Sequence, residues 1–465
     1  MTPSTAVLSP SLPAHALMCR FDADSPACTS YPAVNRFVEA IGAEDVARSL
    51  RLEASRSRLG GVAALAVRVN IPFFDPPADS CACKPVAARR RTRAARYLRA
   101  LQNEIDQAVR DSGSGRMVSR IHVGGAVPLE LSNDELAQVL ALLRESFKVA
   151  ADSVISIEAT ASLCTCERVA ALCSTGFNRL FVAIDDMQSV ATDGASLKLA
   201  LATARGSGSM EVTSEFPGAA SWRDARELAQ AITAVATLRP EHLRITPSGA
   251  LPHRRRVVLE RDAARSVSTI ERSCRLRHVF EHLMLAGYVH LGLDEFALPE
   301  TPLAAASRQG RLRLGVRGFS TRSEGDVLAL GASAIGRVGA VAYQNVERLA
   351  DYDAALQDGR LPVARGLVLA RDDLARECVI KGLLCQGRVA FESISLSHLV
   401  DMRAAFSREF ALLDPLIRAG LVDVDDEALQ LTPAGTWFAP LVAGVFDREL
   451  QRDALRLRLS REEGV

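Results

Sequence analysis

Residues 67–84 read VRVNIPFFDPPADSCACK, and the fold of the chain is inferred outward from this stretch. It continues an apolar run that starts at residue 63 and has the composition of a buried strand. The run leads into a proline-rich loop that ends in Cys81-Ala82-Cys83. A parallel α/β barrel places its metal and ligand sites in loops that follow buried strands. The sequence therefore predicts a site at the carboxyl end of the first strand.

Segments with strand-like and helix-like patterns alternate from residue 63 to residue 293. Apolar residues at helical spacing predict helices at 45–57, 131–147, 166–174, 227–238 and 267–286. Short apolar runs predict strands at 120–123, 154–158, 179–184, 210–215, 242–245 and 289–293. Strands that alternate with helices are typical of a parallel sheet built from βαβ units, so the predicted fold class is α/β.

Composition narrows the class of protein. The 465 residues are 48% hydrophobic, which allows a large core in about two or three domains. The chain has 56 lysines and arginines against 55 aspartates and glutamates, so charge gives no reason to expect nucleic acid or an anionic membrane as a partner. No apolar run approaches the roughly 18 residues of a membrane span, and the start lacks the basic segment of a signal peptide. The ten cysteines are therefore interpreted as reduced thiols of a cytoplasmic protein.

Motifs outside the loop connect the chain to a known family. Thr29-Ser30-Tyr31-Pro32 lies near the start, Gly318-Phe319-Ser320-Thr321 follows the last predicted strand, and residues 431–435 read LTPAG. With the loop, they resemble the oxygen-independent coproporphyrinogen III oxidases, radical S-adenosylmethionine (SAM) enzymes of haem synthesis. The resemblance implies an N-terminal arm at 1–45, a partial (β/α) barrel of radical-SAM type at 46–345, and a helical, winged-helix-like C-terminal domain at 346–465.

The loop departs from the family that it resembles. That family's loop has the form HIPFCxxxCxxCxC, and its first three cysteines hold a 4Fe–4S cluster to which SAM binds. The first two cysteines fall here on Phe74 and Ala78, the third falls on Cys81 and the extra one on Cys83, while Asn70 stands for the histidine. Iron–sulfur clusters are held by thiolates, which phenylalanine and alanine cannot supply. The loop therefore predicts only a remnant of the cluster site, at Cys81 and Cys83.

The resemblance also implies a pocket for SAM inside the barrel. The positions that fall on this pocket are Gly124, Gly125, Glu158, Asp185, Glu211, Gly249 and Ile335. Two further positions differ from the family, because Arg68 stands for a tyrosine and Glu215 stands for the glycine of a DLIYGLP motif. The two consecutive glycines have a second interpretation as a tight turn at a strand end. Glu158 likewise has a second interpretation as a solvated acid.

A second pair of thiols, Cys164 and Cys166, begins the helix predicted at 166–174. Loops that follow parallel strands open on the same end of a barrel, so these thiols are placed to share zinc or an alternative cluster with Cys81 and Cys83. The alternative is that they pack the start of the helix as small apolar groups. The arginine-rich run at 89–99 is interpreted either as a seat for substrate carboxylates or as a solvated helix face.

Three hypotheses about function remain open. In the first, the chain is a pseudoenzyme, a catalytically impaired paralogue that binds a tetrapyrrole, haem or a protein partner. It is favoured because the losses fall on cofactor positions while the packing segments are kept. In the second, the chain is an active enzyme that uses SAM to convert coproporphyrinogen III to protoporphyrinogen IX by oxidative decarboxylation. In the third, it is a zinc-binding interaction protein. The fold does not decide among them, because one fold supports many functions.

Overall fold

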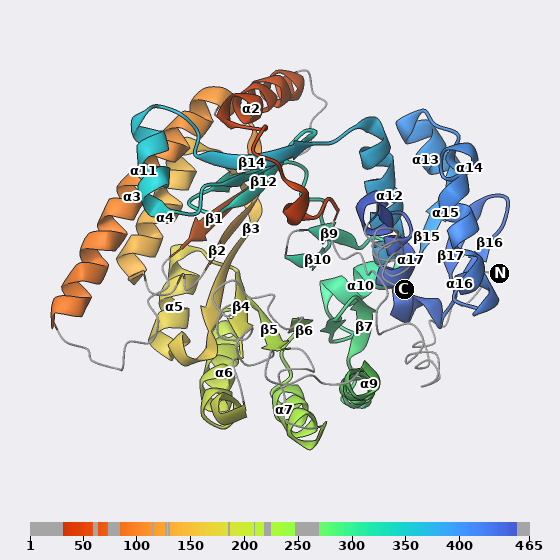
Figure 1. Cartoon of the computed structure of the whole chain (residues 1–465). Coiled ribbons are helices and arrows are strands. Elements are labelled where there is room, and N and C mark those ends of the chain that lie inside the picture. Colours follow the sequence, from red (N-terminus) through yellow and green to blue (C-terminus); the bar gives the residue numbers. More distant parts are fainter. Residues whose placement is uncertain are drawn as a thin grey trace, which may run out of the picture.

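The computed structural model describes residues 31–58, 64–72, 84–113, 115–125, 128, 131–184, 187–208, 210–217, 225–246, 269–315 and 317–452. Among these residues, twelve strands form one open sheet in the order β14-β13-β12-β11-β1-β2-β3-β4-β5-β6-β8-β7 (Figure 1). The loop at 73–83 lies outside the described residues, and so do Phe74, Ala78, Cys81 and Cys83.

The centre of the sheet is parallel, as the alternating pattern predicted. Its strands are β1 (Leu65–Ile71), β2 (Met117–Gly125), β3 (Lys148–Thr160), β4 (Arg179–Ala183), β5 (Glu211–Pro217), β6 (His242–Thr246) and β11 (Val327–Leu330). All adjacent pairs in this set are parallel, including β11 with β1. The helices that lie along the outer face are α3 (Lys84–Ser112), α4 (Asn133–Ser146), α5 (Cys166–Thr175), α6 (Met187–Ser207), α7 (Ala225–Thr237) and α9 (Thr269–Leu285). This arrangement is a partial (β/α) barrel.

Both margins of the sheet are antiparallel, which the sequence did not predict. One margin consists of β12 (Ile335–Val338), β13 (Val341–Asn345) and β14 (Val363–Val368), and the other consists of β8 (Glu295–Ala297) and β7 (Val289–Gly292). The hairpin β9 (Arg313–Gly315) and β10 (Gly318–Ser320) lies between the margins in sequence. Strands of three to six residues carry too few side chains for an alternating pattern to be distinguished from a loop.

The C-terminal region has a hydrophobic cluster of its own, whose residues run from Ala375 to Phe446. Its elements are α12 (Arg371–Gln386), β15 (Arg388–Ala390), α13 (Phe391–His398), α14 (Met402–Ala405), α15 (Ser407–Leu412), α16 (Asp414–Arg418), β16 (Val422–Val424), β17 (Ala428–Leu431) and α17 (Ala439–Gly444). The strands form a small antiparallel sheet in the order β15-β17-β16, beside mostly helical structure. The boundary at 345/346 stays a prediction, and β14 beyond it still belongs to the barrel sheet.

Local signals account for several helix ends. Ser132 caps α4 through a capping box with Glu135, in which each side chain accepts a hydrogen bond from the other residue's backbone N–H. Gly176 ends α5 with a φ of 106°, the left-handed conformation that glycine adopts without strain. Three further helices complete the barrel region: α2 (Ala43–Arg58), α10 (Pro302–Arg308) and α11 (Leu349–Gln357). No helix within the described ranges is long and apolar enough to cross a membrane.

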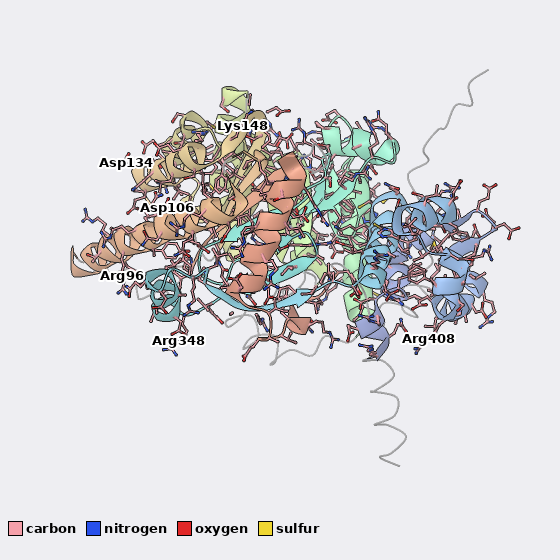
Figure 2. All side chains as sticks on the ribbon, turned by 90° about the horizontal axis from the view of Figure 1, so that it is seen from above. Arg96, Asp106, Asp134, Lys148, Arg348 and Arg408 are labelled. Carbon is pink, nitrogen blue, oxygen red and sulfur yellow. The ribbon has the colours of Figure 1, made fainter. Side chains whose placement is uncertain are left out.

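The described part of the arginine-rich run lies on the outside of α3. Arg91, Arg96 and Arg99 are exposed, and Arg96 forms an ion pair with Asp353 of α11. Figure 2 places Arg96 and Asp106 at the surface of the molecule. These arginines belong to a solvated helix face rather than to the inside of the barrel.

Candidate functional site

The candidate site lies on the inner face of the parallel sheet, near the carboxyl ends of its strands. Side chains alternate between the two faces of a strand. In β5, Val212 and Phe216 belong to the hydrophobic core, and Phe216 faces α7 and α9. The alternate positions Thr213 and Glu215 therefore face inward, and both are buried. The inner face of the barrel thus carries polar groups at positions that are withdrawn from water.

Glu158 on β3 is the centre of this polar cluster. One of its oxygens, Oε1, lies 2.9 Å from Nε2 of His122 and 3.3 Å from Nη1 of Arg317. The other, Oε2, accepts a hydrogen bond of 3.2 Å from the backbone N–H of Gly125. His122 is buried, and its Nδ1 lies 2.9 Å from Oγ of Ser156. Both oxygens of Glu158 and both ring nitrogens of His122 therefore have partners within this chain.

The protonation states follow from these contacts. Burial raises the pKa of Glu158, but the Arg317 guanidinium and the hydrogen bond from His122 outweigh it and hold this pKa well below its usual range. Burial is also the largest influence on His122 and lowers its pKa in spite of Glu158. Burial would lower the pKa of Arg317, but Glu158 and Glu215 raise it above its ordinary value. An ionised Glu158 is thus paired with a charged Arg317 and a neutral His122.

A row of alternating charges extends the cluster across β5, β6 and β8. Glu215, Arg244 and Glu295 are direct neighbours in the sheet register. Oε1 of Glu215 accepts a hydrogen bond of 2.8 Å from Nη2 of Arg317 and lies 3.4 Å from Nη1 of Arg244. Nε of Arg244 lies 3.8 Å from Oε1 of Glu295. Directly opposed unlike charges stabilise a sheet, so Arg244 stabilises the acidic residues on the two strands beside it.

The two glycines at the end of β2 are required by the packing of this cluster. A Cβ on Gly124 would lie 2.6 Å from Nε2 of His122 and 2.7 Å from Oε1 of Glu158. Gly125 has a φ of 126°, and a Cβ there would lie 2.3 Å from the carbonyl oxygen of Ile71. Both contacts are closer than carbon can approach these atoms. The His122–Glu158 pair and the adjoining end of β1 therefore explain why both positions are glycines.

This geometry predicts a large loss of stability for Gly125→Ala. The substitution combines a left-handed backbone with a clash against Ile71, and we expect it to reduce the free energy of unfolding by about 3 kcal/mol. Gly115→Ala is the matched control, because a Cβ there meets no atom within 4 Å. We expect the control to change stability by less than about 0.5 kcal/mol. Chemical denaturation measures both, and equal values would contradict the packing explanation.

Asn70, which the sequence places where the resembling family has a histidine, fastens β1 to the loop after β11. Its Nδ2 donates a hydrogen bond of 2.6 Å to the carbonyl of Ala332. Its own carbonyl accepts one of 2.5 Å from the hydroxyl of Tyr97, which in turn accepts one of 3.2 Å from the N–H of Ala332. The end of β1, directly before the cysteine loop, is therefore held by α3 and by the loop after β11.

Comparison with known proteins defines the relationships of this chain. Oxygen-independent coproporphyrinogen III oxidase of Escherichia coli K12 is 29% identical over 456 residues, which cover 96% of this chain and 97% of that protein. The Pseudomonas aeruginosa PAO1 protein of the same name is 29% identical over 447 residues, or 93% and 95% of the two chains. A model of the HemN C-terminal domain matches residues 369–438. The solved structure of the Escherichia coli enzyme HemN, described as a radical SAM enzyme, has a TM-score of 0.81 and 27% identity, and covers 95% of this chain and 100% of that one.

The chain is similar over nearly its whole length to the oxygen-independent coproporphyrinogen III oxidases. It is a coproporphyrinogen III oxidase-like protein of the radical SAM type, and the expected family and fold are confirmed. The match at 369–438 lies in the C-terminal region, which has the hydrophobic cluster described above. The roles of individual residues stay predictions.

The structure brings together three of the positions that the family resemblance assigned to a SAM pocket, namely Gly124, Gly125 and Glu158. Glu211 lies at the start of β5, in register with Arg179, and so at the opposite end of that strand from Glu215. Ile335 begins β12, which β11 separates from β1. Asp185 and Gly249 lie outside the described residues. Their assignment to one pocket stays a prediction.

The described thiols of the proposed four-cysteine site belong to the start of α5. Cys164 is buried, and its thiol donates a hydrogen bond of 3.4 Å to the carbonyl of Thr160. Cys166 is the first residue of α5 and is half-buried. These contacts agree with the packing interpretation. In the part of the chain that the structure describes, no three His, Cys, Asp or Glu side chains are grouped to hold a metal ion, and a site shared with Cys81 and Cys83 stays a prediction.

Sequence reasoning missed Arg317 and Arg244, which complete the polar cluster. A signal for Arg244 was present, because β6 reads HLRIT and alternates polar with apolar residues where a barrel strand buried on both faces would be apolar throughout. β5, which reads EVTSEFP, shows a similar alternation. Arg317 follows a short strand and carries no such pattern.

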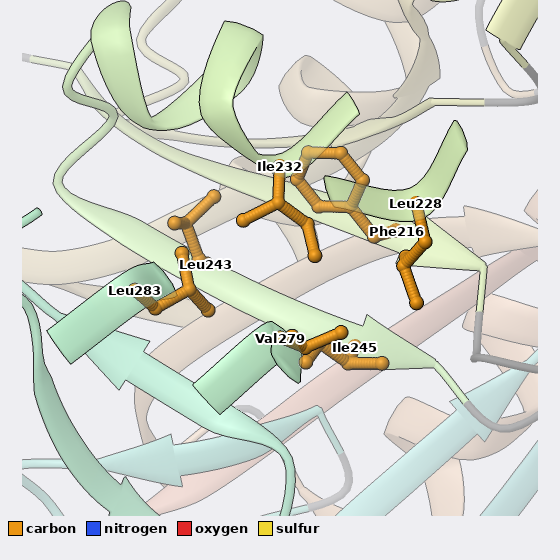
Figure 3. A pocket seen from close by; sticks show the side chains of 7 residues that line it. All are labelled: Phe216, Leu228, Ile232, Leu243, Ile245, Val279 and Leu283. Atoms are coloured by element: carbon orange, nitrogen blue, oxygen red, sulfur yellow. The ribbon is translucent and has the colours of Figure 1, made fainter. Parts of the chain in front are cut away.

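An apolar cavity lies on the other side of β5 and β6 (Figure 3). Its volume is about 10 Å³, which is room for roughly one water molecule. Its lining consists of Phe216, Leu228, Ile232, Leu243, Ile245, Val279 and Leu283. A space of this size is a packing gap between the sheet and helices α7 and α9, and it is too small for a cofactor or a tetrapyrrole.

Proposed function

We propose that this member of the family has lost its radical chemistry and acts as a tetrapyrrole- or partner-binding paralogue in porphyrin metabolism. The observation that carries the proposal is the set of donors in the loop after β1. Two of the three positions that hold the family's cluster are Phe74 and Ala78, which have no atom that binds iron. The proposed location is the cytoplasm, because ten cysteines without a disulfide framework suit a reducing compartment.

The remaining donors do not fit a 4Fe–4S cluster. Such a cluster, when bound, supplies the electron that cleaves SAM. It requires thiolates that converge on its irons, and the loop offers Cys81 and Cys83. The nearby Asp75, Asp79 and Ser80 have hard oxygen atoms, which suit iron–sulfur clusters poorly. No step of a radical reaction is therefore assigned to this chain.

The inner face of the barrel also fits SAM poorly. The Glu158 carboxylate, at the position where the family binds SAM, already pairs with His122 and Arg317. Glu215 places a buried carboxylate where the family's motif has a glycine without a side chain. A cofactor with its own charged groups would have to break these pairs, and separating buried ion pairs costs several kcal/mol. This supports the proposal independently of the loop.

The second candidate is the activity of the curated relatives, which are named as coproporphyrinogen III oxidases. One observation favours it. The Gly125–Glu158 hydrogen bond keeps two of the expected SAM-contact positions together at the strand ends. In that case the chain would decarboxylate coproporphyrinogen III to protoporphyrinogen IX, and 5′-deoxyadenosine would be formed.

Titration of the purified protein with SAM and, separately, with haem tests the proposed function. We expect a saturable change in the haem absorption spectrum in the absence of SAM, and no measurable heat of SAM binding. The Escherichia coli relative, prepared in the same way, is the positive control for SAM. Saturable SAM binding without any response to haem would contradict a tetrapyrrole-binding role and favour the second candidate.

A further inference from the structure

The side chain of Arg317 reaches into the barrel from the turn between β9 and β10. Its Nη2 donates a hydrogen bond of 2.8 Å to Oε1 of Glu215, and its Nη1 lies 3.3 Å from Oε1 of Glu158. Its Cζ lies 4.8 Å from the centre of the Phe181 ring. The side chains of Glu215, Glu158 and Arg317 are exposed by only 2%, 14% and 18%. The guanidinium thus bridges two carboxylates and contacts an aromatic face, away from most of the solvent.

The turn that carries Arg317 is held in place by specific contacts. The backbone N–H of Phe319 lies 3.3 and 3.2 Å from the two carboxylate oxygens of Glu295, to which it donates. Arg244 donates a hydrogen bond of 3.4 Å to the carbonyl of Arg317. Gly318 makes room for this arrangement, because a Cβ there would lie 1.9 Å from Oε1 of Glu295. The contacts of this turn with Glu295 and with Arg244 therefore fix the position of Arg317.

These surroundings match the chemistry of one kind of ligand. A guanidinium is planar, donates in a fork to carboxylates and stacks on aromatic rings. Glu158 and Glu215 supply the carboxylates, and Phe181 supplies the ring. We propose that Glu158, Glu215 and Phe181 form a binding site for a guanidinium-type cation inside the barrel, and that Arg317 of the same chain occupies it.

The inference deepens the proposed function, because an occupied interior leaves a tetrapyrrole or a partner to bind elsewhere on the protein. Only this consequence rests on the proposed function, and the guanidinium site itself does not. A cationic ligand enters the site only by replacing Arg317. A ligand without a positive charge would leave the buried carboxylates of Glu158 and Glu215 without the guanidinium that bridges them, which is unfavourable.

Replacement of the cation by a small molecule tests this. We expect Arg317→Ala to lower the melting temperature of the full chain, and guanidinium chloride at about 20 mM to raise it again by about 3 °C or more. Potassium chloride at equal ionic strength should have no such effect. Wild type should show no rise with guanidinium, because its own arginine fills the site.

Two further variants make the result specific. Arg322→Ala is the matched control, because Arg322 pairs with Asp152 on the surface, where both side chains are largely exposed. It should not respond to guanidinium. Glu215→Gln combined with Arg317→Ala removes a carboxylate along with its cation, and should fold more stably than Arg317→Ala and lose most of the guanidinium response. If Arg317→Ala does not fold, the solubility of the double variant decides. A soluble double variant supports the proposal, and an insoluble double variant contradicts it.

The proposal is overturned if guanidinium fails to stabilise Arg317→Ala, or if it stabilises Arg322→Ala equally. Its failure can be told from failure of the proposed function. A guanidinium response together with an intact 4Fe–4S cluster in the wild type refutes the loss of radical chemistry and leaves this site standing. If neither a guanidinium response nor a cluster is found, the guanidinium site is refuted and the proposed loss of radical chemistry stands.

Discussion

Phe74→Cys combined with Ala78→Cys is expected to raise the iron content after anaerobic reconstitution from a trace to about four atoms per chain. With Cys81, the double variant regains the three-thiol spacing of the family. Thiolates at that spacing are the ligands that we propose this loop lacks. Iron and acid-labile sulfide assays, with the absorption spectrum, measure the result.

The same double variant with Cys81→Ser is the matched control, because it keeps the new thiols and removes the third ligand. It should return to trace iron. The occupied interior adds a second expectation, since a restored cluster alone should still produce little 5′-deoxyadenosine while Arg317 stays in place. No gain of iron in the double variant would show that the loop lacks more than two thiols.

Of the acids that the structure describes outside the candidate site, Glu104 is the most strongly buried, at 1% exposure. Its Oε2 accepts hydrogen bonds of 2.6 Å from both the N–H of Gly331 and the hydroxyl of Tyr352. Its Oε1 accepts one of 2.7 Å from Nδ2 of Asn345. Burial raises the pKa of Glu104 to about 7, although the hydrogen bonds from these partners act in the opposite direction. α3 is therefore joined to the loop after β11, to β13 and to α11 by a carboxyl group that titrates near neutrality.

Glu104→Gln is expected to remove a pH dependence of stability. The folded-state pKa of Glu104, about 7, lies above the unfolded value of about 4.5, so its stabilising contribution is complete below about pH 4.5 and is lost as pH rises to about 7. The free energy of unfolding of Glu104→Gln, minus that of wild type, should therefore increase by about 3 kcal/mol across this window. Urea denaturation at a series of pH values measures the difference.

The difference between the two proteins isolates Glu104 from other groups. The buried His242 and His290, whose pKa values burial lowers to about 3 and about 4, act in the opposite direction but are common to both proteins. Asp106→Asn removes an exposed carboxylate from the same helix, α3, and is the matched control (Figure 2). A difference that stays constant with pH in Glu104→Gln would show that the buried carboxyl does not titrate as described.

The central barrel was predictable because its long elements carry complete patterns. β1 and its neighbours are apolar strands between amphipathic helices. α4 begins at an identifiable capping box, and α5 ends at a glycine. The margins were not predictable for the opposite reason. β8, at Glu295–Ala297, has three residues, and its pairing with β6 is decided by contacts that are distant in sequence.

Part of the candidate site was predictable and part was not. Glu158 and the glycines before it could be identified, because they stand at strand ends and match the family's motifs. The reason for the glycines could not be identified from the sequence. Gly124 makes room for the His122–Glu158 pair, and this pair exists only when β2 and β3 lie side by side. Arg317 could not be identified at all. It is separated from Glu158 by more than 150 residues, and nothing local indicates that its charge is directed inward.

We propose that the chain has lost its cluster, and anaerobic reconstitution of the wild-type chain with iron and sulfide tests this most directly. Iron, sulfide and 5′-deoxyadenosine are measured after reduction in the presence of SAM, with the Escherichia coli relative treated in parallel. We predict far less than one cluster per chain and no 5′-deoxyadenosine above background. One 4Fe–4S cluster per chain, with SAM cleaved at the rate of the relative, would contradict the proposed loss of the cluster and establish the active enzyme.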